Sequence, residues 1–183
     1  ENSVGTLEKL YDVDIDYYLR VNFSGFEAII DTLGGVDVYS EYDFTVDPIK
    51  HYTEGYNHLT GLEALAFVRE RHAFASGDNQ RGRNQMAMLQ AVIKKVCSIE
   101  FLENEVMDEL TDMYRTNIPD ELLKDLVFNQ LMDGTEWTVD IYSVTGSGGS
   151  EKTYSAPNSA AYVMIPNDND VAQAKSLIEA VLN

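Results

Sequence analysis

Hydrophobic and polar positions alternate along the chain in short segments, some with the spacing of helices and others with the aromatic and β-branched content of strands. This pattern predicts helices over residues 6–11, 24–33, 61–68, 81–99, 103–114, 119–131 and 171–182. It predicts strands over 16–23, 36–39, 137–144 and 161–165, a long loop over 42–56, and turns over 146–150 and 166–170. Helices and strands that alternate in this way are typical of an α/β fold.

Local signals mark several helix ends. Residues 24–27 (Ser-Gly-Phe-Glu) and 60–63 (Thr-Gly-Leu-Glu) each have the pattern of a capping box, in which two side chains satisfy backbone N–H groups of the first turn. The glycine pair at 34–35 supplies the left-handed geometry that commonly ends a helix. These signals predict helices that begin near residues 24 and 61.

Two segments are predicted to be buried. The strand over 16–23 is rich in aromatic and β-branched residues. The helix over 81–99 carries an apolar stripe at spacings of three and four that is expected to face the core. The stripe comprises Met86, Leu89, Ile93 and Val96. Cys97 lies in the same apolar run, which indicates an inert core thiol rather than a nucleophile.

The composition narrows the class of protein. The chain has 183 residues, enough for one domain with a buried core, and its 44% hydrophobic and 24% charged residues are ordinary for a globular protein. Its 13 basic and 31 acidic residues give a formal net charge of −18. Binding to nucleic acid or to an anionic membrane surface needs cations on the protein, so this charge argues against both.

Positive charge is nevertheless concentrated in one segment. Four of the six arginines lie within residues 69–83, where there are only two acids, Glu70 and Asp78. These arginines are Arg69, Arg71, Arg81 and Arg83. Guanidinium groups suit phosphate oxygens, as does the N-terminus of a helix. Surface salt bridges to the abundant carboxylates are the alternative, and the composition does not decide between the two.

The spacing within this segment predicts which side chains meet. Extended backbone just after a helix would point Arg69 and Arg71 to the same side. Arg81 and Gln85 are four residues apart and share one face of the following helix, with Asn84 beside them. The segment is therefore a candidate anion-binding site.

Other chemistries have weaker support. The three histidines, His51, His58 and His72, have no metal-ligand spacing, so the sequence does not favour a zinc site. Asp43 and Asp47 could bind a cation, but acids in an acidic protein are usually solvated. The chain has no Gly-x-Ser-x-Gly motif, phosphate-binding loop or dinucleotide fingerprint.

Four motifs follow one another in the first half of the chain. They are Asp16-Tyr-Tyr-Leu-Arg-Val-Asn-Phe-Ser-Gly-Phe26, Asp31-Thr-Leu-Gly-Gly-Val-Asp-Val38, Leu59-Thr-Gly-Leu-Glu-Ala-Leu-Ala-Phe-Val-Arg-Glu-Arg71 and Gly77-Asp-Asn-Gln-Arg-Gly-Arg-Asn-Gln85. In order and spacing they resemble the motifs of the LytR-CpsA-Psr family. The resemblance covers about residues 6–95 and continues more weakly to the C-terminus.

The resemblance implies a bacterial, membrane-anchored enzyme that acts outside the cytoplasm. Family members transfer a glycopolymer, such as teichoic acid or capsule, from a polyprenyl-pyrophosphate carrier to peptidoglycan through a phosphodiester. The resemblance also implies the fold of the family, which is a three-layer α/β/α domain around a central mixed sheet, with an apolar tunnel for the lipid tail. Here one such domain would cover residues 1–183, with its motif-bearing core over about 6–99 and further helices and strands over 100–183.

The resemblance also implies roles for particular residues. It assigns catalytic roles to two motifs. The Arg-x-Arg pair is Arg69 and Arg71 in this chain, and the Asp-x-x-Arg element is Asp78 and Arg81. The residues expected to bind pyrophosphate are Arg69, Arg71, Arg81, Arg83, Asn84 and Gln85. Many relatives carry arginine where this chain has Asn84, and Arg83 could replace that cation. Asp78 is expected to orient an arginine rather than to act as a base.

One part of the family domain has no counterpart in residues 1–15. In the family it carries an Asp and Arg cluster that holds Mg²⁺, so the metal ligands and the membrane-anchoring helix are expected outside this chain. The strand over 16–23 would then lack sheet neighbours, and unpaired strand edges promote aggregation. We expect a partner copy, a rearranged segment or a cleaved N-terminal part to cover that edge.

Two alternatives to a transferase follow from the same sequence. A binding module would hold a polyprenyl phosphate without turnover, whereas an interaction protein of the kind described as a transcriptional regulator would use its arginines only in salt bridges. The transferase interpretation predicts that Arg69, Arg71 and Arg81 converge on one pocket with an apolar throat. Arginines splayed over separate surfaces, each with its own carboxylate, would contradict it.

Overall fold

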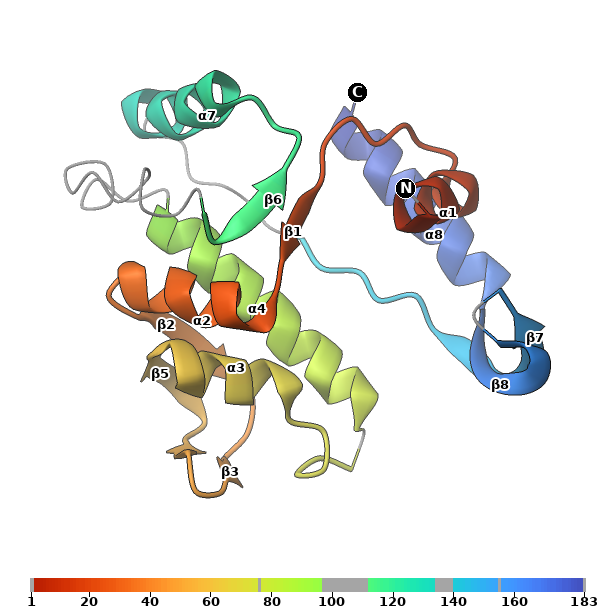
Figure 1. Ribbon diagram of the computed structural model, residues 1–183, viewed down its shortest axis with the longest axis horizontal. Helices are drawn as coiled ribbons and strands as arrows, with labels where there is room; N and C mark the ends of the chain where they lie inside the picture. Colours follow the sequence, from red (N-terminus) through yellow and green to blue (C-terminus); the bar gives the residue numbers. More distant parts are fainter. Residues whose placement is uncertain (1, 76, 97–111, 134–139, 155, 183) are drawn as a thin grey trace. The chain divides into compact units, whose positions relative to one another are not determined.

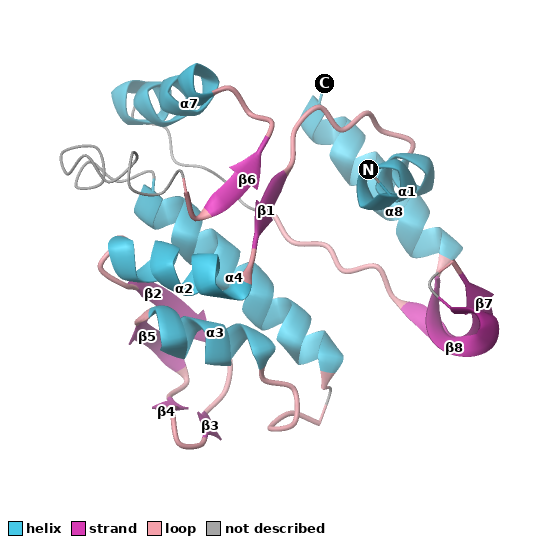
Figure 2. Ribbon diagram, in the orientation of Figure 1, coloured by secondary structure: helices cyan, strands magenta, loops and turns pink. Residues whose placement is uncertain are grey.

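A computed structural model describes residues 2–75, 77–96, 112–133, 140–154 and 156–182 (Figure 1). The chain divides into two compact units, one of Glu1–Asp16 with Asp140–Asn183 and the other of Tyr17–Val139. Helices and strands alternate along the sequence (Figure 2), which confirms the α/β class. The described strands form four two-stranded antiparallel pairs rather than one mixed sheet. A single domain over the whole chain stays a prediction.

The larger unit holds all the arginines. Its elements are β1 (Leu19–Val21), α2 (Phe23–Thr32), β2 (Val36–Ser40), β3 (Phe44–Val46), β4 (Lys50–Tyr52), β5 (Gly55–Leu59), α3 (Gly61–Arg69), α4 (Asp78–Val96), β6 (Tyr114–Thr116) and α7 (Asp120–Asp133). Strand β1 pairs with β6, β2 with β5, and β3 with β4. Helix α2 packs on α3, while α4 packs on β2 and α3.

The core of this unit forms where the β2–β5 pair, the β3–β4 hairpin and the three helices meet. Alternation along β2 buries Val36 and Val38. The rings of Phe44 and Tyr52 stack with centroids 4.6 Å apart, and both contact the fully buried ring of Phe67. The Tyr52 hydroxyl donates a hydrogen bond to the Glu63 backbone carbonyl (2.7 Å). Burial raises the pKa of Tyr52, which keeps this hydroxyl protonated as a donor.

The helix signals were partly correct. Helix α3 begins with the predicted capping box, in which the Thr60 backbone N–H donates to the Glu63 carboxylate at 3.0 Å. Helix α2 ends as predicted, because Gly34 (φ 73°) and Gly35 (φ 88°) adopt left-handed geometry. The predicted Ser24 cap is wrong. Asn22 caps α2 instead, with its side-chain oxygen accepting from the Gly25 N–H at 2.7 Å.

Replacing Glu63 with alanine is expected to lower the free energy of unfolding by about 1 kcal/mol at neutral pH. Burial raises the pKa of Glu63, but hydrogen bonds from Thr60 and Lys50 outweigh it and hold the pKa below its usual value. The stabilisation is therefore present above the pKa of an unfolded glutamate and is lost as the pH falls through the lower folded pKa.

Urea unfolding at a series of pH values measures this effect. The difference between the wild type and Glu63→Ala should shrink as the solution becomes acidic. The exposed Glu54 provides a matched control, and its replacement with alanine should change the free energy of unfolding little. A difference for Glu63→Ala that stays constant down to strongly acidic pH would contradict the assignment.

Two predictions in this unit were only partly correct. The strand expected over 16–23 is only three residues long, and it is not buried, since Leu19 is 62% exposed. Within the described residues, β6 is its one strand neighbour, and the face that carries Leu19 and Val21 lines a groove rather than a packed core. Coverage of its other edge by a partner copy or a cleaved segment stays a prediction. The loop expected over 42–56 contains β3 and β4, each too short to show alternation in the sequence.

The apolar stripe predicted along helix α4 does not form the buried face of that helix. Its buried residues are Gln80, Asn84 and Met88, at a spacing of four. Met86 and Leu89 are 36% and 49% exposed and line a groove rather than the core. Sequence patterning missed the buried face because two of its three residues are polar. Cys97 and the helix predicted over 103–114, apart from its last residues, lie outside the described residues.

The smaller unit consists of α1 (Asn2–Tyr11), β7 (Gly146–Thr153), β8 (Ala156–Pro166) and α8 (Asp168–Leu182), with α1 packed on α8. The turn expected over 146–150 is wrong, because these residues form β7 and pair with β8. Glycine allows this close pairing, since a Cβ at Gly146 would lie 2.4 Å from the Ile165 carbonyl oxygen. The strand expected over 137–144 is not formed by 140–144, and its first residues are not described.

Candidate functional site

The end of α3 presents two arginines to one cleft. Arg69 is the last residue of the helix, and Glu70 adopts extended backbone geometry (φ −65°, ψ 135°), so Arg71 returns to the same side. The Glu70 carboxylate turns toward the following loop and accepts from the backbone N–H groups of His72 and Ala73. The Arg69 guanidinium lies 4.9 Å from the centre of the Phe23 ring, in cation–π contact.

The start of α4 supplies the third arginine and the carboxylate that holds it. Asp78 lies in the first helical turn, where a negative charge is favoured by the helix dipole. Its Oδ1 is 3.4 Å from Nη2 of Arg81 and 3.8 Å from Nη1 of Arg71. One carboxylate is thus shared by two guanidinium groups. This geometry supports the predicted orienting role of Asp78.

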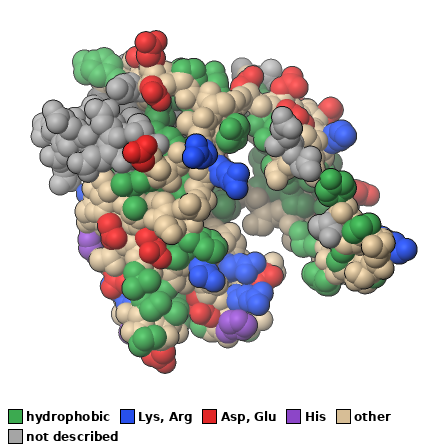
Figure 3. Space-filling model, in the orientation of Figure 1, with side chains coloured by type: hydrophobic (Ala, Val, Ile, Leu, Met, Phe, Trp, Pro, Cys, Tyr) green, Lys and Arg blue, Asp and Glu red, His purple; other side chains and the backbone are tan. Residues whose placement is uncertain are grey.

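The three arginines meet in a cleft of about 670 Å³. Its lining includes Arg69, Arg71, Arg81, His72 and Gln85 together with apolar side chains such as Phe23, Ile49, Leu62 and Val68. Figure 3 shows basic side chains gathered beside a histidine on one face. The predicted convergence of Arg69, Arg71 and Arg81 is confirmed. They are not splayed with one carboxylate each.

An apolar groove of about 470 Å³ adjoins the cleft. Val68 and Gln85 line both hollows, so the two lie side by side. The remaining groove residues come from β1, β6, α2, α4 and α7, and they include Leu19, Val21, Phe26, Leu89, Val92 and Tyr114. The groove is the apolar throat that was expected. Sequence patterning missed the contribution of β1 and β6 because their pairing joins residues almost a hundred positions apart.

Two predicted ligand residues lie away from the cleft. Arg83 pairs with Glu41 (3.1 Å) and also donates to the Gln80 side chain. Asn84 is 3% exposed and hydrogen-bonds to Gln80 (3.1 Å) and to the Phe67 carbonyl (3.4 Å). Arg83 and Asn84 therefore stabilise the position of α4 through these contacts and do not line the cleft. Gln85 does line it, with its amide nitrogen 3.3 Å from the Val68 carbonyl.

The described residues do not fit a metal site. In the described ranges, His, Cys, Asp and Glu side chains form no group of three or more that could hold an ion. The same part of the chain contains no helix long and apolar enough to cross a bilayer.

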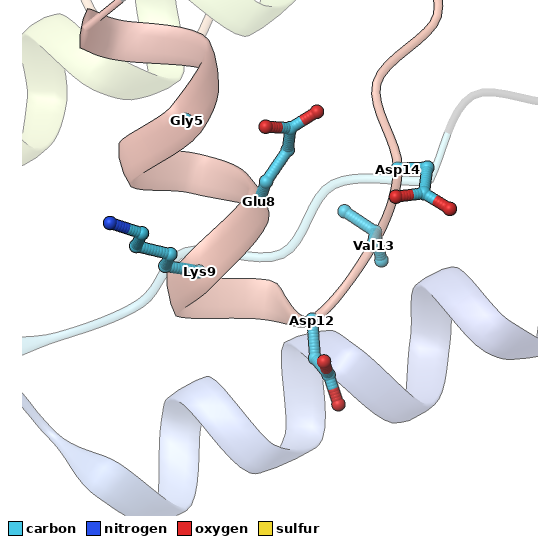
Figure 4. Close-up of a pocket in the computed structure, with 6 residues that line it drawn as sticks. All are labelled: Gly5, Glu8, Lys9, Asp12, Val13 and Asp14. Atoms are coloured by element: carbon cyan, nitrogen blue, oxygen red, sulfur yellow. The ribbon is translucent and has the colours of Figure 1, made fainter.

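A further hollow of about 400 Å³ lies in the smaller unit, at the end of α1 (Figure 4). Glu8 and Asp12 line it, but their carboxylates already have partners. Glu8 accepts from the Ile15 N–H at 3.3 Å, and Asp12 pairs with Lys175 at 3.2 Å. These contacts hold the end of α1 in place, and we assign this hollow no ligand.

A basic cleft beside an apolar groove, on an α/β scaffold, has the chemistry to suit an amphipathic anion, which combines a charged head with a hydrocarbon tail. The sequence model of the LytR_cpsA_psr family matches residues 1–177. The chain therefore belongs to the LytR_cpsA_psr family, as the motifs had indicated.

Relatives and solved structures agree with this assignment. The polyisoprenyl-teichoic acid–peptidoglycan teichoic acid transferase TagU of Bacillus cereus (strain AH820) is 40% identical over 129 residues, which cover 69% of this chain and 42% of TagU. The transferase TagV of Bacillus subtilis (strain 168) is 32% identical over 171 residues, covering 88% of this chain and 42% of TagV. The chain thus spans less than half the length of these relatives.

The crystal structure of B. subtilis TagV superimposes with a TM-score of 0.76 at 27% identity, over 97% of this chain and 68% of that one. This similarity confirms the family fold that the motifs predicted.

Proposed function

We propose that the protein containing this chain transfers an anionic glycopolymer from polyprenyl pyrophosphate to peptidoglycan, outside the cytoplasm. One observation carries the proposal: three arginines line one cleft, and an apolar groove that shares two of its lining residues lies beside it. The cleft suits the pyrophosphate and the groove suits the polyprenyl tail. The transferase names of TagU and TagV support the same reaction.

The arginines suit the charge that develops in this transfer. A hydroxyl oxygen of the acceptor forms a bond to the phosphorus that carries the polymer, and the bridging P–O bond breaks. Polyprenyl phosphate leaves with the bridging oxygen, and the hydroxyl proton is released. Negative charge grows on the bridging and equatorial oxygens, and fixed cations stabilise it most in the transition state. Arg69, Arg71 and Arg81 are these cations.

Asp78 and Gln85 position the site in this scheme. Asp78, at the start of α4, lies between Arg71 and Arg81, and its charge orients both guanidinium groups. Gln85 stands where the cleft meets the groove, at the expected junction of head and tail. The part of Mg²⁺, attachment to a membrane, and the choice between teichoic acid and capsule all stay predictions from the family resemblance.

Farnesyl pyrophosphate is expected to bind this chain at least about tenfold more tightly than pyrophosphate, because burying each methylene contributes ~0.8 kcal/mol. Leu89→Gln should weaken the binding of farnesyl pyrophosphate and leave pyrophosphate unaffected, since Leu89 lines only the groove. Leu126→Gln replaces a leucine of similar exposure on α7 as a control. Calorimetry measures the affinities of the wild type and both variants for the two ligands. Equal affinities for the two ligands in the wild type would contradict the proposal.

A transfer assay separates the enzyme from the binding alternatives. The complete protein that contains this chain, with the metal-binding segment that the family resemblance implies, is incubated with lipid-pyrophosphate-linked polymer and peptidoglycan, and phosphodiester-linked product is measured. Product that forms with the wild type and is lost with Arg71→Ala supports the transferase. A binding module would hold the lipid and give no product, whereas an interaction protein would do neither.

A further inference from the structure

A second pair of arginines lies outside the cleft. In the antiparallel register of β1 and β6, Arg20 stands directly opposite Arg115, and both side chains are exposed. Among the residues that the structure describes, neither has a carboxylate within 4.0 Å. Each of the other four arginines has a described partner: the Phe23 ring for Arg69, Asp78 for Arg71 and Arg81, and Glu41 for Arg83. Arg20 and Arg115 are thus distinct among the arginines of this chain.

This arrangement is unfavourable by itself. Like charges directly opposite each other on one face of a strand pair repel. The chain carries 31 acidic residues that could pair with them. The strand pair is nevertheless held firmly, because the Tyr18 N–H donates to the Asn117 side chain at 2.8 Å and the Thr116 hydroxyl donates to the Tyr18 carbonyl at 2.5 Å. An anion bound between the two guanidinium groups would relieve the repulsion.

The strand pair separates this charge from the apolar groove. Leu19, Val21 and Tyr114 line the groove. Since successive residues of a strand point to opposite faces, Arg20 and Arg115 project from the other face. A lipid tail in the groove therefore lies on one side of the strand pair, and the two arginines lie on the other.

Chain connectivity keeps this pair close to the basic cleft. Arg20 precedes Phe23 by three residues, so their Cα atoms are at most about 10 Å apart. The Phe23 ring contacts the Arg69 guanidinium. Figure 3 shows basic side chains over β1 and β6 on the same face as the larger group beside the histidine. An anionic chain that leaves the cleft would meet both groups within a short distance.

We propose that Arg20 and Arg115 form a second anion-binding subsite, which holds a phosphate of the polymer beyond the pyrophosphate. The inference rests on the proposed function, because it takes the head group to lie at Arg69, Arg71 and Arg81. With the tail in the groove, the polymer leaves from the opposite end of the pyrophosphate, and the face bearing Arg20 and Arg115 is turned away from the groove. This subsite would favour donors whose polymer carries phosphates near the linkage.

The test compares pyrophosphate with linear polyphosphate as probes of the full chain, at constant ionic strength. Calorimetry measures both affinities for the wild type, for Arg20→Gln with Arg115→Gln, and for the charge-preserving Arg20→Lys with Arg115→Lys. The double glutamine variant should weaken polyphosphate binding about tenfold and change pyrophosphate binding less than about twofold. The lysine variant should recover part of the loss, since an ammonium keeps the charge but not the planar fork.

Controls separate this subsite from general electrostatics and from a membrane surface. Lys94→Gln removes an exposed charge on α4, and its effect on the ratio of the two affinities should be small. If the wild type and the double glutamine variant have the same ratio of polyphosphate to pyrophosphate affinity, the proposed subsite is wrong. It is also wrong if Lys94→Gln changes that ratio as much as the double glutamine substitution does. If the double glutamine variant loses binding to anionic phospholipid vesicles while its ratio of polyphosphate to pyrophosphate affinity equals that of the wild type, Arg20 and Arg115 would instead contact a membrane. Failure of the wild type to bind pyrophosphate would instead count against the proposed function.

Discussion

Replacing Arg71 or Arg81 with alanine is expected to weaken pyrophosphate binding about tenfold or more, because each loses a charge-assisted contact worth ~1.5–3 kcal/mol. Both guanidinium groups line the cleft, and both are held by Asp78. Calorimetric titration of the purified variants with pyrophosphate measures the loss. Lysine at either position should recover only part of the affinity, since a point charge cannot bind two phosphate oxygens in a planar fork.

The control for this prediction is Lys94→Ala, which removes one positive charge from the exposed side of α4. It tests whether the overall charge of the chain, rather than the cleft, sets the affinity. Arg83→Ala tests the family-based expectation that Arg83 replaces a missing cation. Because Arg83 pairs with Glu41, we expect its loss to affect stability more than binding. Affinities unchanged in both Arg71→Ala and Arg81→Ala would refute the site.

Replacing Phe67 with alanine is expected to lower the free energy of unfolding by about 3–5 kcal/mol. The Phe67 ring is fully buried, and it contacts the rings of Phe44 and Tyr52 where α3 meets the β3–β4 hairpin. Alanine leaves a cavity there that the surrounding side chains cannot fill. The midpoint of urea unfolding, with the slope unchanged, measures the loss.

Two further variants keep this prediction testable if Phe67→Ala does not fold. Phe67→Leu fills most of the site and should be milder, at about 1–2 kcal/mol. Phe128→Ala removes a ring that is 54% exposed on α7, and it should cost less than either variant at Phe67. A Phe67→Ala variant as stable as the wild type would show that this aromatic cluster does not hold the core together.

The sequence indicated the chemistry well because that chemistry lies in short, contiguous motifs. Arg69 and Arg71 are two positions apart at a helix end, and Asp78 and Arg81 share one helical turn. Local backbone geometry alone decides which of these side chains face together. The capping box of α3 and the glycines after α2 were predictable for the same reason, since their hydrogen bonds join residues a few positions apart.

Tertiary contacts decided the features that the sequence missed. Met86 and Leu89 form part of a groove rather than the core, and the other walls of that groove come from β1, β6, α2 and α7, which are distant in the sequence. Arg83 was expected at the phosphate site, yet Glu41, forty-two residues earlier in the chain, draws it away. Neither outcome follows from helical periodicity, which places a side chain on a face but does not say what that face meets.

The sequence by itself determined the α/β class, the family, and the identity of the arginines in the cleft. Only the tertiary structure decided which strands and helices line the apolar groove beside that cleft, that Arg83 pairs with Glu41 instead of joining the cleft, and that Arg20 faces Arg115. The physical reason is the range of the interactions. Caps and helical spacing act within a few residues, whereas the groove and the second arginine pair depend on β1 and β6, almost a hundred residues apart, whose pairing needs the whole unit to fold.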